Sequence, residues 1–106
     1  MKISAVVITY NEEANIEAAL RSLEGVVSEI VVVDSDSTDL TVKIARRFTT
    51  RIFQRKWTNY SDQKNYADGL ASHPWILSLD ADERLSPELR EEIKALGPGD
   101  PDCSGF

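Results

Sequence analysis

The sequence predicts an α/β domain with a mostly parallel sheet and helices on both of its faces. Segments typical of strands and of helices alternate four times along the chain, which is the pattern of the βα units that build a parallel sheet. The strand segments are short apolar runs, as expected where helices cover both faces of a sheet. Three of them end in polar residues, and ligands of such sheets bind beyond the carboxyl ends of the strands. We therefore expect one ligand-binding domain over residues 1–96.

The first strand is predicted over Ile3–Thr9, where apolar and β-branched residues dominate. Asn11 is expected to cap the helix that follows, with Glu12 and Glu13 as the acids of its first turn. Gly25 is expected to end this helix. The apolar residues spaced at i, i+3, i+4 and i+7 predict its buried face, and they are Ile16, Ala19, Leu20 and Leu23.

The middle of the chain predicts a second and a third βα unit. A strand at 30–33 is followed by six polar residues at 34–39, and a weaker strand is expected at 51–54 before a loop at 57–62. The third helix is expected at about 62–72. The apolar face of the second helix consists of Leu40, Ile44, Ala45 and Phe48, and that of the third of Tyr66, Ala67, Leu70 and Ala71.

The last unit begins with a strand at 75–79 that runs directly into acidic residues. Ser86 and Pro87 predict the start of a final helix, because proline suits the first helical position. Residues 97–106 are rich in Gly, Pro, Asp and Ser, and we expect a loose tail there, at a point where a longer protein is cut. The buried face of the final helix is expected to consist of Leu89, Ile93 and Leu96.

The composition excludes several classes of function. The chain has 106 residues with 18 acidic and 12 basic side chains, a net charge of -6, which argues against a nucleic-acid partner. One cysteine and one histidine, Cys103 and His73, allow neither an internal disulfide nor a Cys/His zinc site. No apolar stretch approaches the roughly 18 residues of a membrane span, and the N-terminus lacks the pattern of a signal peptide. We expect a cytoplasmic location.

Asp80 and Asp82 are the clearest candidate ligands in the sequence. They lie two positions apart where the fourth strand ends, so both carboxylates could reach one hard divalent cation. Oxygen ligands suit Mg²⁺ or Mn²⁺, which complete their coordination with water and substrate phosphates. The alternative is that these acids cap the next helix or face the solvent.

The other two polar strand ends suggest contacts with a nucleotide. Tyr10 could stack on a base and Thr9 could hydrogen-bond to it, while Asp34 could accept a hydrogen bond from a ribose hydroxyl or a base imide. Asp39 is better explained as a cap of the second helix. The first turn contains no glycine, which excludes the glycine-rich dinucleotide fingerprint and the P-loop.

Basic residues gather between positions 43 and 56, where six of the chain's 12 lysines and arginines fall within 14 positions. This basic cluster could contact an anionic membrane surface or an acidic lipid acceptor, and a peripheral location at the inner membrane would follow. The alternative is a solvated helix face and edge strand. Lys64 opens the third helix near the predicted site and could meet a phosphate.

These motifs together resemble the family 2 glycosyltransferases of GT-A fold, a Rossmann-like architecture. The resemblance covers residues 1 to about 96 and rests on motifs in the family's order. With Asp62-Gln63-Lys64-Asn65 it looks most like the bacterial branch that glucosylates the lipopolysaccharide inner core. The motifs are Thr9-Tyr10-Asn11-Glu12, Val33-Asp34 with Ser37-Thr38-Asp39, and Leu79-Asp80-Ala81-Asp82-Glu83-Arg84.

The resemblance implies a nucleotide-diphosphate sugar as donor, most simply a UDP-sugar. Thr9, Tyr10 and Glu12 would line the base pocket together with Asp34. Asp82 would be the main ligand of a Mn²⁺ or Mg²⁺ ion, and Asp80 would contact the ribose, the sugar, or the metal through water. Many members carry a second acid where this chain has Ser35, which weakens the argument for uracil.

The resemblance also implies inverting transfer to a saccharide or lipid-linked acceptor such as the lipopolysaccharide core. The family's catalytic base and acceptor-binding half would lie beyond Phe106, so we expect this chain to bind donor and to be incomplete for catalysis. A cut sheet would leave an unpaired edge strand, which favours a homo-oligomer.

Two other classes of function remain open at this point. Asp34-Ser35-Asp36-Ser37-Thr38 fits the nucleophile and acid of haloacid dehalogenase-like phosphatases, which act with Mg²⁺. That interpretation leaves Thr9-Tyr10-Asn11-Glu12 unexplained. A non-catalytic α/β module that binds a nucleotide or associates with itself is the other alternative.

Overall fold

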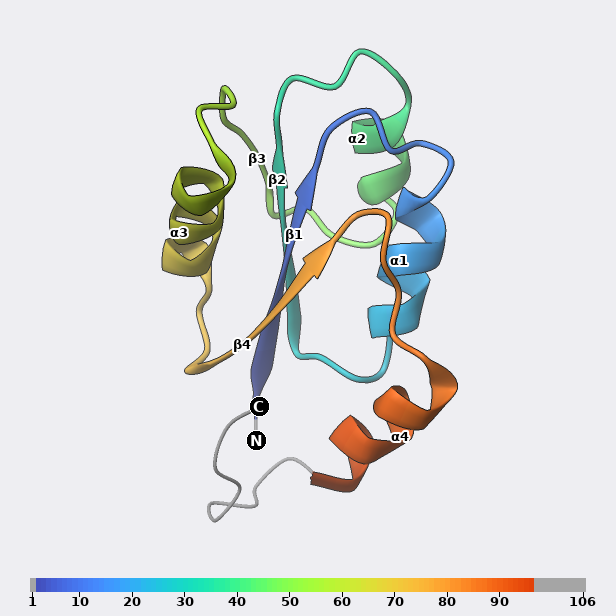
Figure 1. The fold of residues 1–106 in the computed structure, drawn as a ribbon. Helices are drawn as coiled ribbons and strands as arrows, with labels where there is room; N and C mark the ends of the chain where they lie inside the picture. The colour runs from blue at the N-terminus through green and yellow to red at the C-terminus, as the bar shows by residue number, and fades with distance from the viewer. Residues whose placement is uncertain (1, 97–106) are drawn as a thin grey trace.

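The computed structural model describes residues 2–96, which form a parallel sheet of four strands in the order β3-β2-β1-β4. Strands and helices alternate along the whole described chain, so the predicted α/β fold is confirmed (Figure 1). The elements are β1 (Ile3–Thr9), α1 (Ile16–Leu23), β2 (Glu29–Asp34), α2 (Thr41–Ala45), β3 (Ile52–Gln54), α3 (Tyr60–Leu70), β4 (Trp75–Asp80) and α4 (Pro87–Leu96).

The helices cover both faces of the sheet, as predicted. On one face, Ile16 and Leu20 of α1 and Ile93 of α4 pack in the same core as Ala5 and Val7 of β1. On the other face, Ala67 of α3 packs against alternate residues of the central strands, Val6, Ile8, Val31 and Val33. Figure 1 shows α3 alone on its side of the sheet and α1 and α2 on the other.

The central strand determines which loops meet. Every residue of β1 is buried, since β2 and β4 flank it and helices cover both faces. Thr9 pairs with Asp34 of β2, and Ile8 pairs with Asp80 of β4. The carboxyl ends of β2, β1 and β4 therefore lie next to one another, as the sequence predicted.

The predicted start of the first helix is wrong. The helix begins at Ile16 with Asn15 as its N-cap residue, and Asn11 lies in the preceding loop with a φ of 48°. The Asn11 side chain instead accepts a hydrogen bond from the backbone N–H of Thr38, at 2.8 Å. A long-range partner has replaced the local capping contact.

Three apolar side chains predicted to be buried are exposed. Leu40 is 53% exposed because α2 begins only at Thr41, and Leu89 is 40% exposed because Leu85 and Ile93 supply the buried contacts of this region. Tyr66 is 37% exposed and lies under the Arg55 guanidinium, 4.9 Å from the ring centre. The predictions for the Leu96 side chain and for the tail at 97–106 lie outside the described residues.

The third helix starts at Tyr60, earlier than predicted, because Asn59 caps it. The Asn59 side chain accepts a hydrogen bond from the backbone N–H of Asp62, at 2.9 Å. Among residues 2–96, no helix has the length and apolar character needed to cross a bilayer.

Candidate functional site

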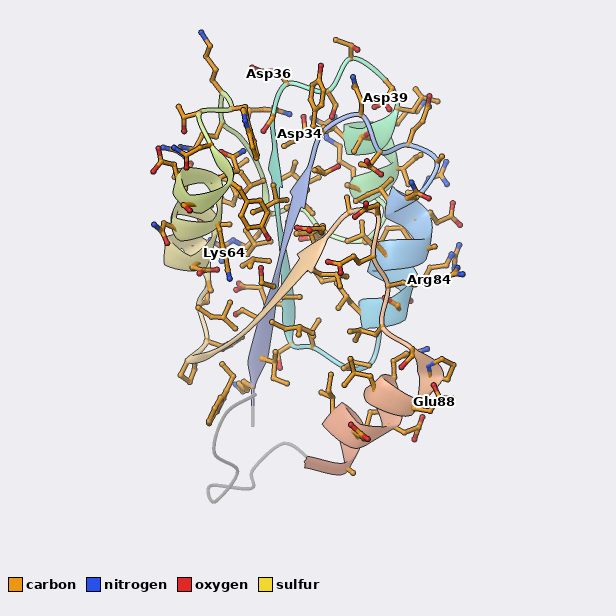
Figure 2. The ribbon with its side chains drawn as sticks, viewed as in Figure 1. Asp34, Asp36, Asp39, Lys64, Arg84 and Glu88 are labelled. Carbon is orange, nitrogen blue, oxygen red and sulfur yellow. The ribbon has the colours of Figure 1, made fainter. Side chains whose placement is uncertain are left out.

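The three polar strand ends are joined by backbone hydrogen bonds that continue the sheet. The N–H of Ser35 donates to the carbonyl of Thr9 at 3.0 Å, and the N–H of Ala81 donates to the carbonyl of Ile8 at 3.2 Å. Figure 2 shows Asp34, Asp36 and Asp39 at this edge of the molecule. The sheet itself therefore determines where the loops of the candidate site begin.

The loops after β1 and β2 are held together by side chain to backbone hydrogen bonds. The backbone N–H groups of Asn11 and Glu12 donate to the hydroxyls of Ser37 and Thr41, both at 2.8 Å. Glu13 N–H donates to Asp39 Oδ2 at 3.2 Å. These bonds hold the backbone of residues 11–13, directly after Tyr10, against the loop that follows β2.

Asp34 is used inside the protein. Its side chain is fully buried, and Oδ2 and Oδ1 accept hydrogen bonds from the N–H and the hydroxyl of Ser37, at 2.8 and 2.5 Å. Its position therefore gives no support to the predicted contact with a nucleotide. It also argues against the phosphatase alternative, because a nucleophilic carboxylate must reach an external phosphate.

Asp39 holds the first residue of α2, but the predicted cap is wrong in position, since Leu40 is the N-cap residue and has no side-chain cap hydrogen bond. Asp39 accepts hydrogen bonds from both the N–H and the hydroxyl of Thr41, the first residue of the helix. Burial acts to raise the pKa of Asp39, but the hydrogen bonds from Thr41 and Glu13 outweigh it and hold the pKa below its ordinary value. The carboxylate is thus charged at neutral pH and tied to the loops.

Five of the seven predicted site residues line one hollow between β1, β4 and α3. Its volume is about 240 Å³. The predicted residues in its lining are Thr9, Tyr10, Glu12, Asp80 and Asp82.

A second hollow of about 630 Å³ lies alongside the first. Tyr10 and Trp57 line both hollows, so the two share a wall. The remaining lining of the second hollow consists of Ser35, Asp36 and Lys56.

Two aromatic residues of the site were missed by the sequence analysis. Trp57 and Tyr60 lie just before and at the start of α3, in the segment predicted as a loop, and with Tyr10 they line the smaller hollow. All three are large and about half exposed, at 49%, 47% and 57%. Clustered exposed aromatic side chains mark ligand-binding surfaces. The presence of two aromatic residues in a segment predicted as a polar loop could therefore have indicated that this segment belongs to the site.

Asp80 and Asp82 differ in how the protein holds them. The hydroxyl of Tyr60 donates a hydrogen bond to Asp80 Oδ1 at 3.2 Å, and the backbone N–H of Asp80 donates to Glu83 Oε1 at 3.1 Å. Burial, followed by the negative charge of Asp80, raises the pKa of Tyr60 above its ordinary value. Within residues 2–96, Asp82 is exposed and accepts no hydrogen bond.

This donor set fits a divalent cation that is shared with a ligand. The described residues contain no group of three or more His, Cys, Asp or Glu side chains able to enclose a metal ion. Two neighbouring carboxylates with free oxygens match instead the way Mg²⁺ binds, through one or two carboxylates, water and substrate phosphates.

The hydroxyl of Thr9 is a further sign of unused binding capacity. Thr9 lines the smaller hollow and is only 2% exposed, yet in the described part of the chain its Oγ1 has no hydrogen-bond partner. A buried polar group without a partner costs about 1–3 kcal/mol. Bound water or a ligand normally satisfies such a group.

Lys64 and the basic cluster are not gathered at the site. Lys64 lies partway along α3 in Figure 2 and lines neither hollow. Within the cluster, Arg51 pairs with Glu29 at 2.6 Å, whereas Lys56 lines the larger hollow. β3 lies between Arg51 and Lys56, and Arg51 lines a separate hollow together with Arg46 and Arg47.

Gln63 is a third residue whose part in the site the sequence analysis missed. It is fully buried on α3, and its Nε2 donates hydrogen bonds to Ser35 Oγ at 2.8 Å and to the carbonyl of Arg55 at 3.3 Å. Gln63 thereby fastens the first turn of α3 to the loop after β2.

The amino-acid sequence matches known proteins over most of its length. Residues 4–104 match the family described as Glycosyl transferase family 2. An uncharacterized glycosyltransferase of Rickettsia felis is 47% identical over 95 residues, which make up 90% of this chain and 34% of that protein. The lipopolysaccharide core biosynthesis glycosyltransferase LpsC of Rhizobium meliloti is 39% identical over 101 residues, 91% of this chain and 37% of LpsC. The chain thus spans about a third of the length of these curated relatives.

Solved structures share the fold. Staphylococcus aureus TarS 1–349 in complex with UDP superposes with a TM-score of 0.69 and 28% identity, over 91% of this chain and 32% of that one. Glucosyl-3-phosphoglycerate synthase of Mycobacterium tuberculosis, in complex with Mn²⁺, UDP and glucosyl-3-phosphoglycerate, gives 0.66 and 26% identity over 78% and 35%. Both similarities cover only a minor part of the larger protein.

Proposed function

Because the chain belongs to glycosyl transferase family 2 and has the GT-A fold, we propose that it forms the donor-binding part of a glycosyltransferase that uses a UDP-sugar. One observation carries this proposal. Thr9, Tyr10, Glu12, Asp80 and Asp82 come from separate strand ends and line a single hollow.

The larger hollow is the proposed site of the base. Tyr10 and Trp57 are exposed aromatic side chains on its wall, and each base stacked on an aromatic ring contributes about 1–3 kcal/mol. Similar structures have been solved with UDP bound, including TarS and glucosyl-3-phosphoglycerate synthase. Asp34 would support the base site indirectly, because its carboxylate holds the loop that carries Ser35 and Asp36.

The smaller hollow is the proposed site of the diphosphate. Asp82 and Asp80 would hold a Mn²⁺ or Mg²⁺ ion between themselves and the phosphate oxygens, as is consistent with the Mn²⁺ in glucosyl-3-phosphoglycerate synthase. Such an ion stabilises the negative charge that develops on a departing diphosphate. The Thr9 hydroxyl supplies a further hydrogen-bonding group beside it.

We propose that the acceptor and the catalytic base are held by residues outside the two hollows. Inverting transfer needs a base that removes a proton from the acceptor hydroxyl, and the site described here provides only donor contacts. The identity with LpsC supports a saccharide of the lipopolysaccharide core as the acceptor. Contact with the inner membrane and association into homo-oligomers stay predictions.

The test is calorimetric titration of UDP into the 106-residue chain with and without Mn²⁺, repeated on Asp82→Asn. We expect Mn²⁺ to strengthen UDP binding, and Asp82→Asn to weaken the Mn²⁺-supported binding about a hundredfold, since a ligand of the cation is lost. Glu88→Gln is the matched control, because it removes the same charge from α4 (Figure 2), and Glu88 lines neither hollow. Equal binding by the two variants, or no UDP binding by the unaltered chain, would contradict the proposal.

A further inference from the structure

The feature that carries the inference is the contact between Tyr60 and Asp80, which links the start of α3 to the end of β4. We propose that Tyr60 is a positioning residue of the donor site: its hydroxyl holds Asp80 Oδ1 and leaves Oδ2 available to a divalent cation. The inference rests on the proposed function, because it assigns a part within that site.

The geometry of Asp80 supports a division of its two oxygens. Oδ1 accepts the hydrogen bond from Tyr60 at 3.2 Å, whereas Oδ2 accepts none from residues 2–96. The backbone at Asp80 is also held, since its N–H donates to Glu83 Oε1. Asp80 is therefore oriented by the protein on one side only, while Asp82 is left without any such contact.

Side-chain hydrogen bonds hold the backbone of the first turn of α3 on both sides of Tyr60. Asn59 accepts a hydrogen bond from the N–H of Asp62 at 2.9 Å, and the side chains of Thr58 and Asn59 both donate to Asp62 Oδ2 at 3.1 Å. These reciprocal bonds form a local cap around the residue that carries the phenol.

A buried anchor fastens the same turn to the rest of the site. Gln63 is fully buried and donates to Ser35 Oγ, and Ser35 lines the hollow proposed for the base. Gln63 therefore fixes the helix that carries Tyr60 to the hollow proposed for the base. The Tyr60 hydroxyl reaches Asp80, which lines the hollow proposed for the diphosphate.

A purely structural role explains Tyr60 less well. The side chain is 47% exposed and belongs to neither core cluster. The hydroxyl forms its hydrogen bond with a carboxylate that lines the ligand hollow. Removing the hydroxyl while keeping the ring should leave the stability of the fold close to unchanged.

The experiment compares Tyr60→Phe with Tyr66→Phe in titrations of UDP with and without Mn²⁺. Both variants remove one phenolic hydroxyl from α3, but Tyr66 lies under Arg55, away from Asp80. We expect Tyr60→Phe to weaken the Mn²⁺-supported binding about tenfold, since one hydrogen bond to a charged group is lost. Binding without metal and the melting temperature should match those of Tyr66→Phe.

Asp80→Asn separates the positioning role from a direct contact with the ligand. If Tyr60 acts through Asp80, adding Tyr60→Phe to Asp80→Asn should change the UDP affinity less than about twofold. A full additional tenfold loss would overturn the positioning role.

The positioning role would also be overturned if Tyr60→Phe and Tyr66→Phe bound UDP equally well in the presence of Mn²⁺. The proposed function would then stand. Absence of UDP binding by the unaltered chain would overturn both. Should Tyr60→Phe fail to fold, Asn59→Ala, which loosens the cap, must reproduce the metal-dependent loss.

Discussion

Glu29 at the amino edge of the sheet and Thr9 and Asp82 at its carboxyl edge differ in how far the protein satisfies their polar groups. At the amino edge, Glu29 accepts hydrogen bonds from the Ser4 hydroxyl, the Ser72 N–H and the Arg51 guanidinium, at 2.8, 2.9 and 2.6 Å. At the carboxyl edge, the Thr9 hydroxyl and the Asp82 carboxylate have no hydrogen-bond partner within residues 2–96. A complete set of partners stabilises the fold, whereas free capacity beside a hollow is what a ligand requires.

The comparison separates two quantities that substitutions can change. Substitutions at the amino edge should lower the free energy of unfolding and leave UDP binding unchanged. Substitutions of hollow-lining residues at the carboxyl edge, such as Asp82 and Tyr60, should weaken UDP binding and leave the free energy of unfolding unchanged. A variant that changed both quantities equally would show that the two edges are not distinct in function.

The largest effect on stability is expected for Glu29→Gln. Burial acts to raise the pKa of Glu29, but the hydrogen bonds from Ser72, Ser4 and Arg51 outweigh it and lower the pKa to about 2. The charged form therefore stabilises the fold, and its loss should cost about 2 kcal/mol at pH 7. Urea unfolding measures this, with Glu88→Gln as the control. A change below about 0.5 kcal/mol, the range of ordinary surface substitutions, would contradict the prediction.

The same contact predicts the pH dependence of stability. The folded pKa of Glu29 is about 2, below the ordinary value of 4.5, so the unfolded chain binds the proton first as the pH falls. The contribution of the Glu29 carboxylate to the free energy of unfolding is complete above pH 4.5 and is lost progressively between pH 4.5 and 2. Over this window the unaltered chain should lose stability more steeply than Glu29→Gln, and the two should converge near the acid end.

The strands and their polar ends were predictable from the sequence, but much of the site was not. The apolar runs around Val7 and Val32 predict buried strands, and parallel packing then places Asp34 and Asp80 at one edge. The prediction that Asn11 starts the first helix was wrong, because the Asn11 side chain accepts a hydrogen bond from Thr38, far along the chain. Tyr60 was missed for the same reason, since its contact with Asp80 spans the helix between them. Local patterning detects periodicity and local caps, and long-range polar pairs leave no such signal.

Trp57→Leu tests the other half of the site, the wall shared by the two hollows. We expect UDP to bind about tenfold more weakly both with and without Mn²⁺, because the loss of stacking on a base does not depend on the cation. This distinguishes Trp57 from Asp82 and Tyr60, whose effects should appear mainly with metal. Tyr66→Leu is the control, since it replaces another exposed aromatic residue that lines neither hollow. A loss of UDP affinity seen only with Mn²⁺ would indicate that Trp57 contacts the diphosphate and not the base.

The smallest effect is expected for Gly25→Ala, which compares how the two edges handle strained backbone. At the carboxyl edge, Asn11 and Asp36 adopt positive φ values of 48° and 55°, whereas the turn between α1 and β2 places a glycine at 75°. A Cβ at Gly25 would meet no atom within 4 Å, so the substitution tests backbone conformation alone. We expect a loss of about 1 kcal/mol in the free energy of unfolding, the cost of holding an L-residue in the left-handed region. UDP binding should not change. A neutral result in urea unfolding would mean that this turn adjusts its backbone without cost, and a change in UDP affinity would mean that the amino edge communicates with the donor site.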